Sequence, residues 1–401
     1  MGISDHYFDV IENIGKHIDQ LLIDSDQRHF DVIENIGKHI GQLKPWFPSQ
    51  AIICIGEYSI QTLLKGHFME RIDDVLPIFI GKSSEDIQKW SQFRLEPYNI
   101  LGLDTKLDTY FWFNVYPNIV KNDEFFTRLK NKPINSIRQA IIVSSVWDGI
   151  GSALLPSLSS QLKVLNINSV SLAVLPSKLQ PPDVHFNAFS SIGISASMGS
   201  SPILLINRNN LENYVGVNRK GAKITGNMLL DYLIELLFSK ETLVQELSEL
   251  SRSFNIKIFT VLSTTGASLR IYGSIENVLA SALLRPLMTF DLSSASVLYV
   301  LLRIPSQLKT KLPREKLELS IVNWFKDKAS LKSIYFSDPI YAEDASDRID
   351  VVVFVGGFDV SEMFTSMEKD IDVIKSDVIG RGLISEEEWQ GIVKSLIEVN
   401  G

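Results

Sequence analysis

Ala51-Ile52-Ile53-Cys54-Ile55 is a short run of apolar, mostly β-branched side chains that ends at Gly56. Comparable runs recur at Leu76 to Ile80, Tyr98 to Leu103, Gln139 to Ser144, Lys163 to Ile167, Ser171 to Val174 and Pro202 to Asn207. Longer amphipathic segments lie between them, such as Ser152 to Leu162 and Asn187 to Ala196. Runs that are apolar throughout suit strands buried on both faces, and their alternation with helices predicts an α/β fold with a parallel, doubly wound sheet.

A long helix-forming segment follows, from Lys223 to Phe254. Its leucines and aromatic residues recur at helical spacing without a proline, so we predict one continuous connecting helix. Beyond it we expect strands at 256–262, 296–304, 333–336 and 348–358 and a helix at 275–284, which is an α+β pattern. In the tail, Ser361-Glu362 and Ser385-Glu386-Glu387-Glu388 each predict the start of a helix.

The sequence FDVIENIGKHI occurs twice near the start of the chain, at residues 8–18 and 30–40. The apolar residues of each copy fall at three- and four-residue steps, which predicts a helix with one apolar stripe. Pro45 and Pro48 end this extension, because paired prolines cannot continue a helix. The extension packs on the body of the protein, or residues 1–46 form an arm that binds a partner; its acidic polar face disfavours a membrane-surface helix.

The composition excludes several functional classes. The 401 residues carry 39 Lys+Arg against 47 Asp+Glu, a formal charge of −8, so we expect no nucleic-acid partner. The single cysteine, Cys54, and six scattered histidines offer little from which to build a disulfide or a metal site. No apolar stretch approaches the roughly 20 residues of a membrane span, and the first residues do not read as a secretory leader, so we expect a cytoplasmic protein without a transmembrane segment.

Two C-terminal motifs carry a resemblance to a known family. ALLRPLM at 282–288, followed by ASVL at 295–298, is similar to a helix-to-strand passage of the tubulin and FtsZ superfamily of filament-forming GTPases, and RIDVVVFVGGFD at 348–359 resembles another strand of that family. The resemblance runs from about residue 51 to 359. It implies a Rossmann-like GTPase-type domain at 49–222, a long central helix at 223–254 and a smaller α+β domain at 255–362, flanked by the helical extension at 1–48 and a helical tail at 363–401.

Other segments resemble the parts of the family that surround a guanine nucleotide. VHFNAFS at 184–190 is similar to a loop of tubulins and the archaeal CetZ group, and LINRNNL at 205–211 to a second one, which implies nucleotide-side roles for Asn187 and Arg208. Asn227 falls where the family reads the guanine edge, a task that suits an amide, although it also suits the start of a helix. Asp104 resembles an acidic loop residue near the magnesium-phosphate group.

The family cradles its phosphates in glycine-rich loops, because glycine lets backbone N–H groups approach closely. Here the first loop keeps only Gly56 and the second, SVWDGIGS at 145–152, keeps Gly149 and Gly151 before Ser152; a third reads YPN at 116–118. Trp147 fills space, and the Asp148 carboxylate about 4 Å from a phosphate is repulsive by roughly 1 kcal/mol in water. The pocket therefore either binds GTP or GDP through an altered loop, with Mg only beside GTP, or has degenerated; we favour degeneration.

Hydrolysis in the family depends on carboxylates in the loop after the central helix, which polarise water in a neighbouring subunit. Counting back without gaps from STTGASL at 263–269 puts Phe254 and Lys257 at the acid positions, where neither can act. A different register puts Glu246 and Glu249 there. We prefer the first register, since Glu246 and Glu249 lie inside a periodic helix and read as a solvent-facing pair.

The expected function follows from this resemblance. We expect a divergent prokaryotic FtsZ- or tubulin-like cytoskeletal protein, with an archaeal origin among the options, that forms head-to-tail filaments with little or no GTP hydrolysis. One alternative is a working GTP-hydrolysing filament protein of cell division or cell shape. Another is a non-polymerising adaptor that binds a cytoskeletal or division protein through residues 1–46.

Overall fold

The computed structural model describes residues 48–66, 74–91, 95–120, 123–198, 201–343, 346–360, 372–373, 375–382 and 384–398. The repeats at 8–18 and 30–40 lie outside these residues, so their helical form and the partner-binding arm stay predictions. Ser361-Glu362 also lies outside them. The second tail helix is confirmed as α17 (Glu386–Glu398), where Ser385 Oγ accepts from Glu388 N at 3.1 Å and the Glu388 carboxylate accepts from Ser385 N at 2.8 Å.

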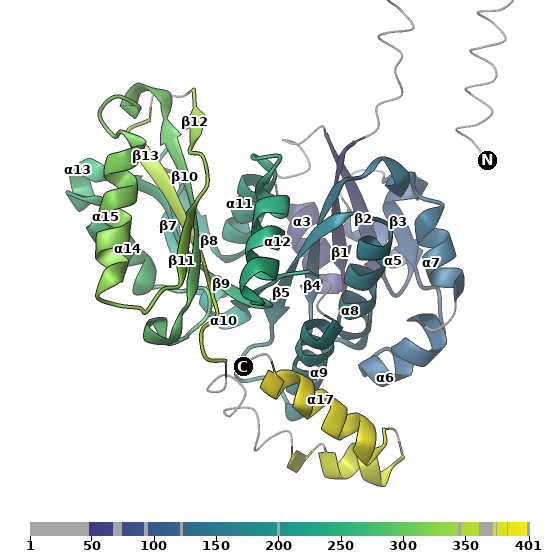
Figure 1. The fold of residues 1–401 in the computed structure, drawn as a ribbon. Coiled ribbons are helices and arrows are strands. Elements are labelled where there is room, and N and C mark those ends of the chain that lie inside the picture. The colour runs from purple at the N-terminus through teal and green to yellow at the C-terminus, as the bar shows by residue number, and fades with distance from the viewer. Residues whose placement is uncertain are drawn as a thin grey trace, which may run out of the picture. The chain divides into compact units, whose positions relative to one another are not determined.

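The apolar runs form one large sheet (Figure 1). Its parallel part consists of β1 (Gln50–Ile55), β2 (Val75–Gly81), β3 (Ile100–Gly102), β4 (Gln139–Ser145), β5 (Asn168–Leu175), β6 (Ile203–Asn207) and β9 (Ile258–Ser268). The remainder consists of β10 (Val297–Pro305), β11 (Ser333–Phe336), β12 (Ile340–Ala342) and β13 (Arg348–Gly356). The order is β11-β10-β13-β9-β6-β5-β4-β1-β2-β3, with β12 beside β10. The predicted α/β class with a dominant parallel sheet is confirmed.

The second half of the sheet differs in strand direction. β13 runs antiparallel to both β9 and β10, whereas β11 and β12 run parallel to β10. β9 joins this half to β6 through parallel pairing of Ile203 with Ile258 and Leu205 with Thr260. The two predicted domains thus share one continuous sheet, and the boundaries drawn at 222 and 255 remain predictions.

Helices cover both faces of the sheet and bury two separate apolar layers. On one face lie α8 (Gly149–Val164), α9 (Pro182–Met198), α14 (Ile275–Leu283) and α15 (Arg314–Lys326), and α17 packs on α9 (Figure 1). On the other lie α3 (Glu57–Lys65), α5 (Ser84–Trp90), α10 (Arg208–Glu212), α11 (Gly226–Phe238) and α12 (Leu243–Phe254). Shorter elements are α6 (Trp112–Val115), α7 (Asp123–Lys130), α13 (Leu269–Tyr272) and the hairpin of β7 (Val215–Val217) and β8 (Lys223–Thr225). None of the helices in these described ranges is long and apolar enough to cross a membrane.

The predicted single helix over 223–254 is wrong, because β8 takes its first residues and α11 ends at Phe238. At the break, the Ser239 N–H donates to the Glu235 carbonyl at 3.0 Å and to the Leu236 carbonyl at 3.2 Å, and the Ser239 hydroxyl donates to the same Leu236 carbonyl at 2.6 Å. A serine that caps the last turn in this way competes with continued helix. Periodicity persists through the break because α11 and α12 both bury leucines in the same apolar layer.

The predicted strand at 163–167 is also wrong. Lys163 and Val164 end α8, and Asn166 adopts a left-handed conformation with φ of 58° before β5 begins at Asn168. Asparagine tolerates that conformation and commonly ends a helix. Val164 belongs to the helix, whereas Leu165 and Ile167 follow it. Their alternation with polar residues resembles the pattern of a strand.

Candidate functional site

The carboxyl ends of β1 and β4 bring two loops together. Gly56 follows β1 with φ of 84°, and its N–H donates to the Ile80 carbonyl at 3.0 Å. A Cβ on Gly56 would lie 2.6 Å from Ser145 Oγ and 2.7 Å from Asp148 Oδ2. Only glycine fits between the loops, and the side chains that press on it are those of the second loop.

Asp148 occupies the N-terminus of α8 with its own carboxylate. Oδ1 accepts the Gly151 N–H at 2.7 Å, and Oδ2 accepts the Ser145 hydroxyl at 3.1 Å. The start of a helix offers unpaired N–H groups and a partial positive charge, which is why phosphates bind there in other proteins. In this chain an internal anion takes that position.

A second donor of the loop is also engaged. The Gly149 N–H donates to the Thr109 carbonyl at 3.0 Å, and a Cβ on Gly149 would lie 2.5 Å from that oxygen. Ser152 turns its hydroxyl inward, to the Val146 and Asp148 carbonyls at 3.0 and 2.6 Å. The segment around Thr109 therefore lies directly against the predicted phosphate loop.

Asn187 of α9 ties these two segments together. Its buried side-chain amide donates to the Tyr110 carbonyl at 2.8 Å and the Trp147 carbonyl at 3.2 Å, and its oxygen accepts the Trp112 N–H at 3.1 Å. All three bonds go to backbone groups: two in the segment of Tyr110 and Trp112, and one at Trp147 in the loop before α8. Asn187 thus holds these two segments together, and its nucleotide-side role stays a prediction.

Arg208 and Asn227 each contact the Tyr58 side chain. The Tyr58 and Trp147 rings pack edge to face with centroids 4.9 Å apart, and the Arg208 guanidinium lies 5.1 Å from the first centroid and 5.2 Å from the second. The Tyr58 hydroxyl donates to Asn227 Oδ1 at 3.0 Å. Glu212 holds the same guanidinium at 2.7 Å. Arg208 and Asn227 are both predicted to lie beside a nucleotide, and in the structure both contact Tyr58.

Asp104 sits apart from this group. Its carboxylate accepts the Ser84 N–H at 2.9 Å and the Ser84 hydroxyl at 3.0 Å, with Arg128 at 3.9 Å. These contacts tie the residue to α5 and α7 rather than to α8. In the described part of the chain, no cluster of three or more His, Cys, Asp or Glu side chains could hold a metal ion.

The electrostatics of the loop follow from burial. Burial raises the pKa of Asp148 to about 6, against the lowering effect of the Gly151 N–H and Ser145 hydroxyl, and Glu57 adds a nearby negative charge. Burial also raises the pKa of Tyr58, reinforced by Glu212. Both shifts have the same leading cause, the partial burial of these side chains, and a neighbouring glutamate adds to each. The Gly149 and Gly151 N–H groups of this loop thus donate to groups of the chain itself.

Glu246 and Glu249, the candidates of the second register, have different environments. Glu246 is largely buried and binds Lys240 at 2.8 Å, the Thr242 hydroxyl at 2.6 Å and the Tyr299 hydroxyl at 2.7 Å. Burial alone would raise its pKa, but these donors lower it. Glu249 is exposed and accepts from Gln245 at 2.8 Å. The expectation of a solvent-facing pair is therefore wrong for Glu246, which joins the start of α12 to β10.

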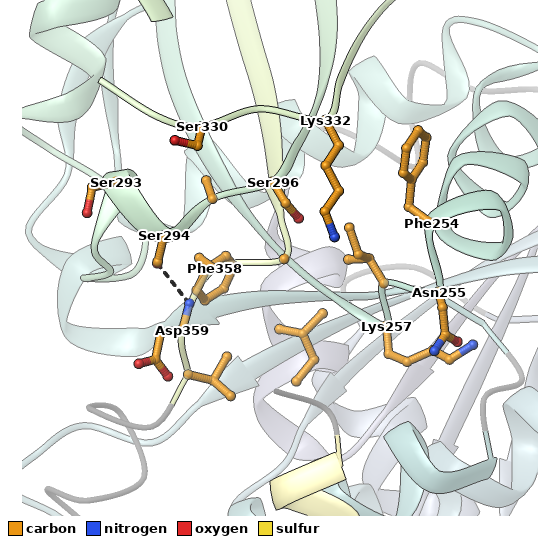
Figure 2. A pocket seen from close by; sticks show the side chains of 15 residues that line it. Phe254, Asn255, Lys257, Ser293, Ser294, Ser296, Ser330, Lys332, Phe358 and Asp359 are labelled. Atoms are coloured by element: carbon orange, nitrogen blue, oxygen red, sulfur yellow. Dashed lines mark hydrogen bonds between the residues drawn. The ribbon is translucent and has the colours of Figure 1, made fainter. Parts of the chain in front are cut away.

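Phe254 and Lys257, the gap-free candidates, line a cavity of about 750 Å³. Figure 2 shows the Lys257 and Lys332 side chains on one side of it and Ser293, Ser294 and Asp359 on the other. The cavity lies where β9 begins, at the opposite edge of the sheet from Gly56 and Asp148.

One more carboxylate, that of Glu241, lies in a loop that neither register considers. The loop that directly follows α11 consists of residues 239–242 and contains Glu241. Neither of the two registers counted from the sequence places a catalytic acid in this loop. The Glu241 carbonyl accepts from Gln139 at the first residue of β4, which places this segment at the same edge as the cavity of Figure 2. The signal was the Ser239-Lys240 pair, which interrupts the leucine pattern between Phe238 and Leu243.

Comparisons with known proteins were made at the level of sequence and of structure. No family model matches the chain, and no curated protein sequence matches it. Among solved structures, CetZ from Methanosaeta thermophila strain DSM 6194 aligns with a TM-score of 0.65 and 14% identity over 88% of this chain and 97% of that one. The GDP-bound monomer of CetZ1 from Haloferax volcanii gives 0.61 and 15%, over 82% and 99%.

A third structure adds an assembled form. The GTPγS-bound protofilament of CetZ2 from Haloferax volcanii gives a TM-score of 0.60 and 17% identity, over 82% of this chain and 99% of that one. These alignments span nearly the whole of each known chain, including both halves of the sheet. The predicted resemblance is therefore confirmed at the level of structure: this chain has the fold of the tubulin and FtsZ superfamily.

Proposed function

We propose that this chain is a divergent FtsZ- or CetZ-like cytoskeletal subunit that associates head to tail into filaments. Support comes from the shared fold and from the fact that one similar structure is a protofilament. Head-to-tail contacts join two different surfaces, and such contacts extend without limit unless they close into a ring. The two edges of the parallel sheet, one with Asp148 and the other with Glu241, are the surfaces that would meet.

We infer further that the filament forms with little dependence on GTP or GDP. The observation that carries this inference is the Asp148 carboxylate on the N-terminus of α8, supported by the Thr109 carbonyl on the Gly149 N–H. A phosphate would have to displace both internal groups and would meet the charges of Asp148 and Glu57. Binding is therefore weak or absent, and hydrolysis correspondingly low.

The test is the nucleotide content and the assembly of the purified full-length chain. We expect well below one guanine nucleotide per chain after acid release and chromatography. Sedimentation and negative-stain microscopy should show filaments to the same extent with and without GTP. Stoichiometric guanine nucleotide, or filaments that form only with GTP, would contradict the proposal for nucleotide; a chain that stays monomeric in both conditions would contradict the proposal for assembly.

A matched pair of variants tests the cause. Replacing Trp147 and Asp148 together by glycine frees the Gly151 N–H and removes bulk and charge, so GTP binding should become measurable by calorimetry. Glu57→Gln is the control, because it removes one negative charge at the same edge while Asp148 still caps α8. An equal gain in both variants would show that net charge, and not the internal cap, prevents binding.

A second candidate is a working GTPase, which the position of Glu241 favours. This carboxylate follows the central helix α11, as the resemblance implies for the acids that polarise water. Phosphate release from GTP above the concentration for assembly, lost in Glu241→Gln but kept in Glu249→Gln, would establish this candidate. Absence of phosphate release in the parent chain would exclude it.

A further inference from the structure

The large sheet splits between β6 and β9. The two strands pair only from Ile203–Ile258 to Leu205–Thr260. β6 then ends at Asn207, while β9 continues to Ser268 along β13. The second half of β9 therefore has a strand on one side only, and its other edge faces the β7–β8 hairpin.

The hairpin approaches this edge closely without closing it. Gly266 has φ of 55°, and a Cβ there would lie 2.4 Å from the Asn218 carbonyl oxygen. The Tyr214 hydroxyl meets the Thr265 hydroxyl at 3.2 Å. Between the hairpin, β9 and the ends of α13 and α14 remains a cavity of about 340 Å³, within the size range of small-molecule sites.

Two guanidinium groups line this cavity. Arg285 donates to the Val215 carbonyl and Arg348 to the Gly266 carbonyl, each at 2.8 Å. Each bond uses one of the five N–H donors of an arginine, and the planar fork of the remaining donors suits a carboxylate or a phosphate. The hydroxyls of Tyr272 and Ser281 add neutral donors to the same wall.

The lining carries no compensating negative charge. Among the described residues that form it there is no Asp or Glu. The two acids nearest in sequence to Arg348 have other cationic partners: Asp347 lies 3.5 Å from Arg270, and Asp350 lies 2.7 Å from Arg303 while its second oxygen accepts the Gly266 N–H behind the cavity wall. The described lining residues thus carry two positive charges and no negative one, on walls that are otherwise largely apolar.

Ser263 provides an independent sign of a ligand. This residue of β9 lines the cavity, is only 2% exposed, and its hydroxyl has no hydrogen-bond partner in the part of the chain that the structure describes. A buried hydroxyl without a partner costs about 1–3 kcal/mol, so native structures usually satisfy it. The hydroxyl oxygen has almost no exposed surface in the free chain, so a bound molecule with acceptor oxygens would satisfy it after a rotation of the Ser263 side chain toward the cavity.

We propose that this cavity binds a small oxyanion, the phosphate or carboxylate group of a small molecule, through Arg285, Arg348 and the Ser263 hydroxyl. The site is separate from the loops around Asp148, and the proposal does not depend on filament formation. The exposed aliphatic side chains of Val215 and Ile271 at the cavity wall leave room for an apolar part of the same ligand.

The experiment is calorimetric titration of the full-length chain with inorganic phosphate and, separately, with acetate, each against chloride at matched ionic strength. The two arms show which oxyanion the site prefers. We expect saturable binding of at least one anion, weakened about tenfold or more in Arg285→Gln and about threefold or more in Ser263→Ala. Arg252→Gln is the control, because this exposed arginine of α12 lies outside the lining and should leave the affinity unchanged.

Thermal unfolding without added anion separates binding from folding. Ser263→Ala removes an unsatisfied hydroxyl, so it should not lower the unfolding temperature of the free chain. The proposal is overturned if neither anion binds saturably, if Arg285→Gln and Ser263→Ala bind as tightly as the parent, or if Arg252→Gln loses as much affinity as they do.

Discussion

Two inward-facing carboxylates of this protein, Asp148 and Asp350, have opposite surroundings. Asp350 lies on β13 with no exposed surface and accepts from Arg303 at 2.7 Å, the Tyr232 hydroxyl at 2.6 Å and the Gly266 N–H at 2.8 Å. In the described part of the chain Asp148 accepts from neutral donors, among them the Gly151 N–H and the Ser145 hydroxyl. A full positive charge compensates one anion, and hydrogen bonds alone hold the other.

This difference gives the two carboxylates different roles: Asp350 is a fixed part of the core, whereas Asp148 occupies a position that another anion could take. The Arg303 guanidinium also lies 4.7 Å from the Tyr232 ring and 3.3 Å from the Glu235 carboxylate, so Asp350 belongs to a network that fastens α11 to β10 and β13. The network lies within the apolar layers and cannot exchange its anion for one from solvent. Asp148 stands at a helix start at the edge of the sheet, where an external anion could take its place if the loop opened.

The largest expected effect is on stability. Asp350→Ala should lower the free energy of unfolding by about 3–5 kcal/mol, because it leaves the Arg303 charge buried without its closest partner. Asp148→Ala should cost only about 0.5–2 kcal/mol, the usual loss for a helix cap. Urea unfolding followed by circular dichroism measures both, with Asp350→Asn as a milder variant if the alanine variant does not fold. Equal losses of stability at the two positions would contradict the view that Arg303 makes Asp350 the more important carboxylate for folding.

The next effect is a dependence of stability on pH. Asp148 has a raised pKa of about 6 in the folded chain against an ordinary value of 3.8, so between these values the folded state holds the extra proton. The free energy of unfolding contributed by this group therefore falls as pH rises through that window, by on the order of 2 kcal/mol. Unfolding of the parent and of Asp148→Asn should be compared at about pH 4 and about pH 7. Since asparagine still caps a helix, the variant should gain relative to the parent only at the higher pH; a constant difference would refute the assignment.

The smallest effect concerns the ring cluster beside Asp148. Tyr58→Phe removes the hydrogen bond to Asn227 but keeps the ring against Trp147 and Arg208, so it should cost less than about 1 kcal/mol. Tyr58→Ala also removes the ring contacts and should cost more. Thermal unfolding of the two variants gives the comparison. If both cost the same, the hydroxyl and not the ring holds the cluster together.

Much of the fold was predictable because it rests on local pattern. The runs at Ala51 to Ile55 and Gln139 to Ser144 became β1 and β4, and the Ser385 start of α17 was read from its capping residues. The predictions of one helix at 223–254 and of a strand at 163–167 were wrong, because their sequence patterns were ambiguous. The leucine period crossed the break at Ser239, and the apolar end of α8 mimicked a strand.

For the candidate site, the sequence determined which residues are present: glycines lost from the loop, and Trp147 and Asp148 in their place. Only the tertiary structure decided what they do, because the partners come from distant positions. Thr109 reaches Gly149, Asn187 joins Tyr110 to Trp147, and Asn227 meets Tyr58. Strand formation depends on the side chains of one segment, whereas a hydrogen bond or a cavity depends on which segments the sheet order brings side by side. That is why the strands could be predicted from the chain alone, but the internal cap on α8, the Asp350 network and the cavity at the split between β6 and β9 could not.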